Sequence, residues 1–317
     1  MLIGSQIVAQ ACADAHQPNA TTVGQNKLQI ILDECCYKHD FALARGVYNF
    51  FLNPATITTI NGVTNFGGPY PLPLDYLRTS ASSGSDGVQY SFFYYFNGVP
   101  YPLRPWDLGR LDMQVQQAGI QNLPYAFATD VSPESTAQDR LAGTTTAATT
   151  SGSPVITVAT SANILNGMSV AGLGIAPGAV ITNIAGPSLT LSLNCTGTFP
   201  AAPIMFGTPV NAYVYPGPSG SFPTVLRYQR LMPPLLDFTR IPWFPDQDFL
   251  LTRLTADMMA TTDDTRWDAF QGRARMLIGE YETFADDKTN RAQTVLLDRN
   301  RFGRNFQRLP NTKTIGW

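Results

Sequence analysis

The stretch SGSPVITV (residues 151–158) lies in the most unusual part of the chain. Residues 141–226 contain no Asp, Glu, Lys, Arg or His. This region is rich in Thr, Ser, Gly, Pro, Val and Ile, which favour strands and tight turns. It therefore predicts β-structure. It excludes, within its own bounds, a carboxylate pair, a histidine metal site and a basic phosphate clamp.

Short strands separated by Gly and Pro are expected in the first part of this region. The five strands predicted from the pattern span residues 155–159, 168–171, 179–184, 189–193 and 204–206. Together they predict an inserted β-sandwich or barrel over residues 143–206. With about 60 residues, such a unit is near the lower limit for an independent core.

The N-terminal part of the chain predicts two helices. Small or apolar residues recur every fourth position from Ile3 to Ala15, and a break follows at 17–19. Thr22 and Gln25 have the spacing of a capping box. The second helix, which should end near His39, carries an apolar stripe of Leu28, Ile31, Leu32, Cys35 and Cys36.

The C-terminal part predicts two more helices. One begins at Pro245-Asp246, and the other spans about 263–288. The second carries apolar residues at alternating intervals of three and four, as in a short heptad seam. We expect this seam to pack against the N-terminal helices, through Trp267, Phe270, Ala274, Leu277, Tyr281 and Phe284.

Strand patterns dominate between these helical parts. Aromatic residues fill 88–96, and Asn97-Gly98 predicts a tight hairpin onto 99–103. A short helix is expected at 106–113. Further strands are expected at 47–52, 55–60, 125–130, 210–215 and 222–230. Three prolines within 67–78 argue against a central strand there.

The predicted fold class is α+β. A helical bundle is formed by N-terminal helices (1–54) and C-terminal helices (241–290) that pack together. An antiparallel β domain comprises 55–142 and 207–240, and it carries the small all-β module at 143–206. The last part, 291–317, is expected to be an extended basic arm.

The composition favours a protein with large contact surfaces. Charged residues make up 14% of the chain, against about 25% in ordinary soluble proteins. A β-rich monomer with a Ser/Thr/Asn surface is the alternative. The four cysteines show no CxxC spacing, so we expect buried thiols and synthesis in a reducing cytosol. No apolar run is long enough to span a membrane.

The arm at 291–317 combines positive charge with aromatic rings. Asp298 is its one acidic residue. Docking into a partner groove, contact with DNA and disorder are all open, and the mixture of charge and rings favours docking. The proposed docking residues are Arg291, Arg299, Arg301, Phe302, Arg304, Phe306, Arg308 and Trp317.

No catalytic motif is apparent. His16 and His39 lack a ligand at the spacing of a helical metal site, and we expect no metal and no cofactor. The carboxylate pairs Asp33-Glu34 and Asp286-Asp287 are expected on solvated helix faces. An enzyme acting on cell walls would need a glutamate in a cleft, and none of Glu34, Glu134, Glu280 and Glu282 has such a context. We therefore predict that the chain is not an enzyme.

The order of three motifs resembles a known family. YPLPLDYLR (70–78) follows the N-terminal helices, and YVYPGP (213–218) precedes LRYQR (226–230). This arrangement, with the closing helices and the basic arm, resembles the head-to-tail adaptor proteins of short-tailed bacteriophages. In that resemblance the second and third motifs belong to one hairpin.

The resemblance implies a structural virion protein of the neck. It would form a homo-oligomeric ring, expected to be a dodecamer, and it would join the portal protein to the tail nozzle protein. The helices would form the ring and channel, the arm would enter portal grooves, and the β domain would meet the nozzle and a tail fibre or tailspike. DNA would pass through without specific binding, and assembly would take place in the host cytoplasm.

The segment 143–206 resembles a module of phage structural proteins. The motifs that carry this resemblance are SGSPVIT (151–157), GMSVAGLGI (167–175) and LTLS (189–192). Such modules look immunoglobulin-like or barrel-like and decorate surfaces. The alternative function is accordingly a glycan-binding or decoration component of the tail, although Phe199 and Phe206 are the only aromatic residues in this segment.

Overall fold

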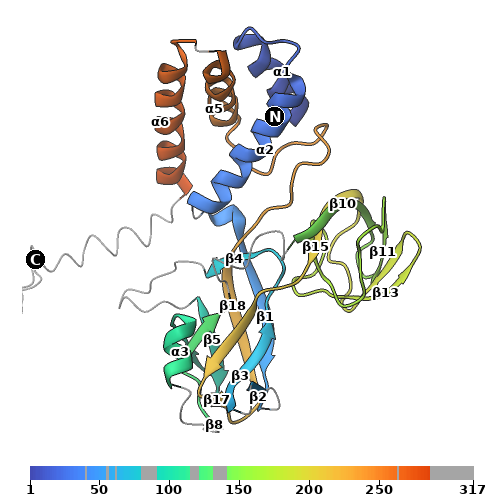
Figure 1. Cartoon of the computed structure of the whole chain (residues 1–317), viewed down its shortest axis with the longest axis vertical. Coiled ribbons are helices and arrows are strands. Elements are labelled where there is room, and N and C mark those ends of the chain that lie inside the picture. The colour runs from blue at the N-terminus through green and yellow to red at the C-terminus, as the bar shows by residue number, and fades with distance from the viewer. Residues whose placement is uncertain are drawn as a thin grey trace, which may run out of the picture.

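The computed structural model describes residues 1–39, 41–54, 57–60, 63–79, 91–114, 121–130, 141–262 and 264–285. The fold is mixed α+β with mostly β content, few helices and antiparallel sheets, as predicted; two short strand pairs are parallel. Four helices lie at one end, two five-stranded sheets at the other, and a six-stranded sheet at the side (Figure 1).

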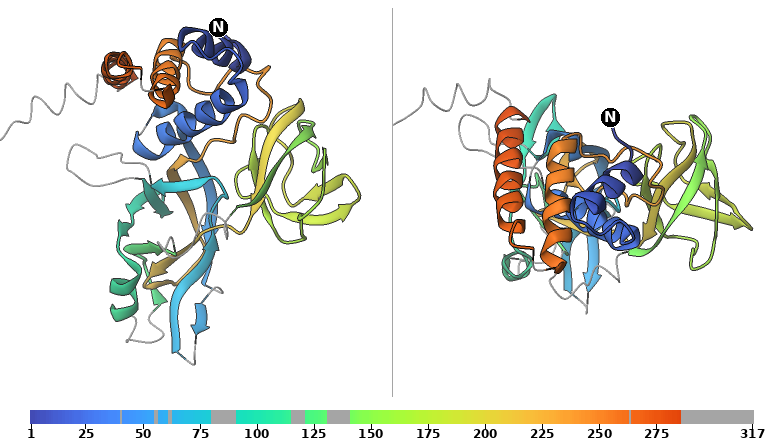
Figure 2. Two further views of the ribbon diagram at one scale, coloured as in Figure 1. Left: turned by 45° about the horizontal axis from the view of Figure 1, so that its top comes forward. Right: turned by 90° about the horizontal axis from the view of Figure 1, so that it is seen from above.

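The helices come from both ends of the described chain. They are α1 (Gly4–Asp14), α2 (Thr21–Lys38), α5 (Gln247–Met259) and α6 (Trp267–Ala285), here called the helical unit. The short turns η1 (Ala42–Ala44) and η3 (Ala260–Thr262) follow α2 and α5. Helix α5 contacts the other three, and it lies between α6 and the α1–α2 pair (Figure 2).

One core joins these helices. The stripe Leu28, Ile31 and Leu32 is at most 2% exposed, and Phe270, Leu277 and Tyr281 of α6 pack against the same core half-buried. Buried Ala274 belongs to it as well. Gly24 allows α2 to approach α1 closely, because a Cβ there would lie 2.8 Å from Cγ1 of Val8.

Local predictions for the helices needed three corrections. Trp267 is 40% exposed, because it is the first residue of α6 and lies where the helix leaves the core. Helix α6 begins after 263, since Asp264 accepts from the backbone N–H of Arg266 and holds a turn there. Helix α2 has Ala20 as its N-cap, without the predicted capping box. Phe284 is in α6, but its side chain is outside the described part.

The first five-stranded sheet has the order β1-β18-β5-β6. Its strands are β1 (Arg45–Leu52), β18 (Phe222–Arg230), β5 (Phe92–Phe96) and β6 (Val99–Pro102), and β4 (Tyr76–Thr79) also pairs with β18. The hairpin at Asn97-Gly98 is confirmed, with φ values of 51° and 79°. One edge strand, β6, carries Pro100 and Pro102, whereas β1 at the other edge has no proline.

The second sheet has the order β2-β3-β16-β9-β7. Its strands are β2 (Ile57–Ile60), β3 (Val63–Pro71), β16 (Asn211–Tyr215), β9 (Ala126–Thr129) and β7 (Arg104–Pro105). Helix α3 (Leu108–Gln114) and the strand pair β8 (Gln121–Asn122) and β17 (Gly217–Pro218) accompany it. Aromatic rings fill the core of these sheets, among them Phe92 and Phe127 at 4.7 Å between centroids.

Three predictions about these sheets were wrong. Strand β1 pairs along its whole length with β18, so it belongs with the sheet and not with the helices, where the boundary at residue 54 had put it. Residues 67–71 lie in β3, an inner strand; the register skips Pro69 at a bulge, which relieves the missing N–H. Strands β16 and β18 lie in different sheets and do not form a hairpin.

The sheet at the side, here called the side sheet, has the order β12-β15-β10-β11-β14-β13. Five of its strands match the predicted ones: β11 (Val155–Val158), β12 (Ser169–Gly172), β13 (Ile181–Ala185), β14 (Ser188–Leu191) and β15 (Phe199–Gly207). The sixth, β10 (Leu141–Thr149), was missed. The side sheet contacts the rest of the chain through Ala171 and Met205, which pack on Leu74 and Leu231.

A buried polar cluster fastens the start of β4 to β18 within the first sheet. The carboxylate of Asp75, 4% exposed, accepts from the Tyr228 hydroxyl at 2.9 Å and from Arg230 Nε at 2.6 Å. Burial and the nearby Asp75 carboxylate raise the pKa of Tyr228. In the same segment, Arg78 donates to the carbonyls of Tyr37 and His39 at the C-terminal end of α2. We call Asp75, Tyr228 and Arg230 the Asp75 cluster.

Removing the charge of Asp75 should destabilise the protein. In Asp75→Asn, Arg230 keeps its charge in a largely buried site without its counterion, and we expect a loss of about 3 kcal/mol in the free energy of unfolding. Urea denaturation followed by circular dichroism measures it. The control is Asp248→Asn, which removes the exposed Asp248–Arg273 pair and should change little. If both variants lost the same free energy of unfolding, the Asp75 cluster would contribute no more to stability than an exposed ion pair.

Candidate functional site

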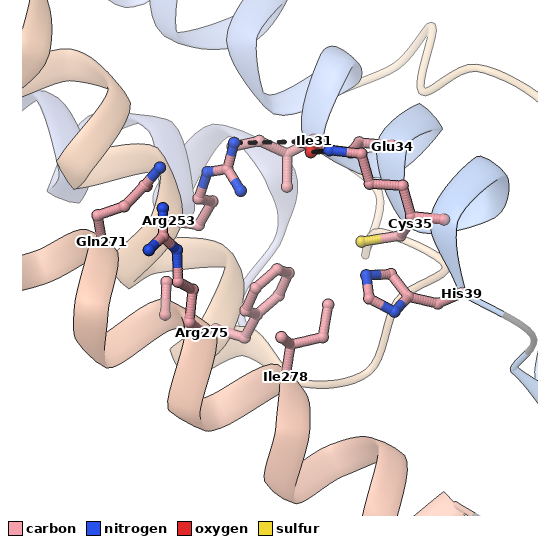
Figure 3. A pocket seen from close by; sticks show the side chains of 11 residues that line it. Ile31, Glu34, Cys35, His39, Arg253, Gln271, Arg275 and Ile278 are labelled. Atoms are coloured by element: carbon pink, nitrogen blue, oxygen red, sulfur yellow. Dashed lines mark hydrogen bonds and ion pairs between the residues drawn. The ribbon is translucent and has the colours of Figure 1, made fainter.

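A cavity of about 330 Å³ lies between α2, α5 and α6 (Figure 3). Apolar and charged side chains from all three helices line it. The lining residues are Ile31, Glu34, Cys35, Lys38, His39, Phe249, Arg253, Gln271, Ala274, Arg275 and Ile278. Positions 34, 35 and 38 lie on one side of α2 because they are three and four residues apart.

Ion pairs fix the carboxylate in this cavity. Glu34 accepts from Arg253 Nη2 at 3.1 Å and from Lys38 Nζ, while Arg253 Nε also lies 3.3 Å from Asp257. Burial raises the pKa of Glu34, but the hydrogen bond from Lys38 and the charges of Arg253, Lys38 and His39 outweigh it and the net shift is downward. A general acid needs a raised pKa, so this environment does not suit Glu34 for that role.

The prediction of solvated carboxylates was therefore wrong for Asp33-Glu34. The Glu34 side chain is 24% exposed and paired. Asp33 is half-buried, and burial raises its pKa although a hydrogen bond from Gln29 lowers it. The reason is that α2 contacts α5 on one side and the segment after β18 on the other, where Gln29 accepts from the N–H of Leu235. Asp286-Asp287 lie outside the described residues.

The remaining polar groups of the cavity differ in their partners. His39 Nδ1 lies 2.5 Å from Glu282 Oε1. In the part of the chain that the structure describes, Arg275 has no ion-pair partner and the buried Oε1 of Gln271 accepts no hydrogen bond. Burial raises the pKa of the Cys35 thiol to about 12, so this thiol is protonated at neutral pH and is not a ready nucleophile.

The chemistry available in the cavity is recognition of charge. Its guanidinium and ammonium groups outnumber its single carboxylate, and Arg253 of α5 and Arg275 of α6 both line the cavity (Figure 3). Within the described residues, no group of three His, Cys, Asp or Glu side chains could hold a metal ion. A second cavity, of about 260 Å³, lies between α2, the side sheet and residues 230–243.

Some of the residues singled out from the sequence lie outside the described part of the chain, and others lie inside it. All eight docking residues of the arm, from Arg291 to Trp317, lie outside the described part, and so does Glu134. His16 follows α1 in a turn, not on a helix, with φ 57°. Phe206 is buried and Phe199 is half-buried beside Gly174 and Gly197, so neither offers the open ring face that sugar stacking needs.

Neither the Asp75 cluster nor the ion pairs of Glu34 were predicted from the sequence. Asp75 shows one signal in retrospect, since it is an acidic residue inside the apolar run 72–77. No local signal joins Glu34 to Arg253, because 219 positions separate them.

No family model matches the chain, and no curated protein matches it. Among the described helices, none is long and apolar enough to cross a membrane.

The Glu34 ion pairs should make stability depend on pH. The folded pKa of Glu34 lies below its ordinary value of 4.5, so its contribution is present above pH 4.5 and is lost as the pH falls through the lower folded pKa. Glu34→Gln should lower the free energy of unfolding at pH 7 by at most about 1 kcal/mol. Toward pH 3 the variant and the unmodified chain should converge.

Urea denaturation at both pH values measures this difference. The exposed Glu280 of the same unit gives the control variant, Glu280→Gln, which should follow the unmodified chain at both pH values. A deficit of Glu34→Gln that stays constant down to pH 3 would contradict the assignment.

Proposed function

We propose that this chain is a structural connector, a head-to-tail adaptor in the neck of a short-tailed bacteriophage. It forms a ring that joins the portal protein to the tail nozzle and to fibres or spikes, and it surrounds the path of DNA ejection. In this proposal the helical unit is a bundle, and the side sheet is an inserted module. The chain catalyses no reaction.

One observation carries the proposal: the molecule has two distinct ends, and hydrogen bonds from the first sheet to the end of α2 connect them. The first and last helices share a core at one end, and the aromatic core of the sheets lies at the other (Figure 1). Arg78 of β4 connects the two by donating to the carbonyls of Tyr37 and His39, and the Asp75 cluster holds β4 on β18. A connector needs separate surfaces for two partners and direct contacts between the parts of the chain that carry those surfaces.

Exposed apolar side chains support the same role. Ile30 and Met276 of the helical unit are 63% and 67% exposed, and Val47 and Phe51 on the edge strand β1 are 52% and 56% exposed. Apolar side chains gathered on exposed elements mark surfaces that partners cover. With charged residues at 14% of the chain, much of the surface suits burial in an assembly.

The charge of the chain fits a conduit. The formal net charge is −2, so the protein as a whole has no strong attraction for the phosphate backbone of DNA. DNA slides through a ring more easily when the ring binds its phosphate backbone weakly. A decoration role for the side sheet in glycan binding is the alternative, and the covered rings of Phe199 and Phe206 favour it less.

Deleting 291–317 should separate folding from docking. The described core ends at Ala285, so the truncated chain should keep its circular dichroism spectrum and melting temperature. We expect it to lose binding to purified portal rings, measured by negative-stain microscopy and co-sedimentation. Truncated protein that still added a layer beneath portals at normal affinity would contradict the docking role of the arm.

A second variant separates charge from anchoring. Phe302→Ala with Phe306→Ala keeps every arginine of the arm, and it should weaken portal binding at least ~10-fold if the rings act as anchors.

A further inference from the structure

Two polar side chains of α6 line the cavity between α2, α5 and α6 without partners in the described chain. The buried Oε1 of Gln271 accepts no hydrogen bond from the described residues, and Arg275 forms no ion pair with any of them. The two residues are four positions apart, so they are neighbours on one face of α6 (Figure 3). Buried polar groups are almost always hydrogen-bonded. An unmet acceptor beside an unmet cation therefore indicates a ligand that supplies a donor and a negative charge.

The other charged groups of the cavity already have partners. Glu34 pairs with Lys38 and Arg253, and Nδ1 of His39 lies 2.5 Å from a carboxylate oxygen of Glu282. The unpaired guanidinium on α6 is thus the group whose charge a ligand can balance. A guanidinium binds a carboxylate through two parallel hydrogen bonds, which fixes the direction of the ligand as well as its charge.

The cavity also offers room for an apolar group. Each of the three helices contributes an apolar side chain to its lining, namely Ile31, Phe249 and Ile278. Its volume of about 330 Å³ is at the lower end of the range of small-molecule sites, roughly 300–1,000 Å³. A ligand of this size is a single apolar side chain with the polar groups next to it.

We propose that this cavity binds an α-carboxylate together with the amide N–H and the apolar side chain beside it. The carboxylate pairs with Arg275, the amide N–H donates to Oε1 of Gln271, and the apolar side chain packs against Ile31 and Ile278. The last residue of a polypeptide chain carries these three groups, and so does an N-acylated amino acid. The inference does not rest on the proposed function, because it needs neither a ring nor the arm at 291–317.

A free amino acid fits the cavity less well. It carries an ammonium group where the acylated form has an amide N–H. That ammonium would enter a cavity in which cations already outnumber the single carboxylate, and Glu34 is engaged by two of them. Like charges at short range disfavour the charged ligand. Acylation should therefore improve binding.

Isothermal titration calorimetry on the full-length protein tests the class of ligand. N-acetyl-leucine should bind, whereas its carboxamide and free leucine should bind at least ~10-fold more weakly. A fourth probe, an acetylated peptide of three alanines and a final leucine with a free carboxylate, represents a chain end. Tighter binding of this peptide than of N-acetyl-leucine would assign the site to the chain end of a partner protein, and the reverse order would assign it to a free N-acylated amino acid.

Three full-length variants test the assigned contacts. Arg275→Gln removes the cation and Gln271→Leu removes the acceptor, so each should weaken binding of N-acetyl-leucine at least ~10-fold. The control is Arg273→Gln, which lies two residues from Arg275 on α6. Arg273 pairs with the exposed Asp248 and does not line the cavity, so this variant should bind as the unmodified chain does. Gln271→Leu should melt no lower than the unmodified chain, because it removes a buried acceptor that has no donor.

Four outcomes would overturn the inference. N-acetyl-leucine and the peptide could both fail to bind the unmodified chain at millimolar concentration. The carboxamide could bind as tightly as the acid, which would remove the role of the negative charge. Arg273→Gln could weaken binding as much as Arg275→Gln. A melting temperature of Gln271→Leu well below that of the unmodified chain would mean that the Gln271 amide serves the fold and not a ligand.

Discussion

The buried carboxylate of Asp75 is the constraint on which the arrangement of this molecule depends. It lies directly before β4, and it accepts from Tyr228 and Arg230 of β18 in the same sheet. An unpaired buried charge is costly, so β4 and β18 can separate only if water or another cation replaces both donors. Arg78, three residues further on, extends the same restraint to the last turn of α2. The Asp75 cluster therefore fixes the strand from which Arg78 reaches α2.

The segment that follows β18 also caps the first helix. After Leu231 it crosses the helical unit, and its carbonyls at Phe238 and Arg240 accept from Ser5 and Gly4 in the first turn of α1. These N–H groups have no partner within their own helix. The beginning of the chain is thus closed by a segment more than two hundred residues later, which explains why helices from both ends share one core.

Periodicity made the helices and most strands predictable from the sequence. The stripe at Leu28, Ile31 and Leu32 marks a buried face because burial and the helix repeat share one period. Strand β10 was not predicted because its run of Thr and Ala shows no alternation of apolar and polar residues. The hairpin of β16 and β18 was wrong because local turn residues at 216–220 do not reveal that the chain changes sheets there. The cavity between α2, α5 and α6 depends on contacts between distant segments, such as Glu34 with Arg253, for which a single sequence has no signal.

The edge strands β1 and β6 of the first sheet differ in how easily a strand of another chain could pair with them. Pro100 and Pro102 deprive β6 of N–H groups, so an added strand would find an incomplete ladder there. Strand β1 keeps its N–H groups and shows Val47 and Phe51 to solvent. Of the two ends of the order β1-β18-β5-β6, β1 is therefore the one where an accidental strand finds a complete ladder before assembly. A partner that covers β1 would also protect newly made chains from pairing with one another there.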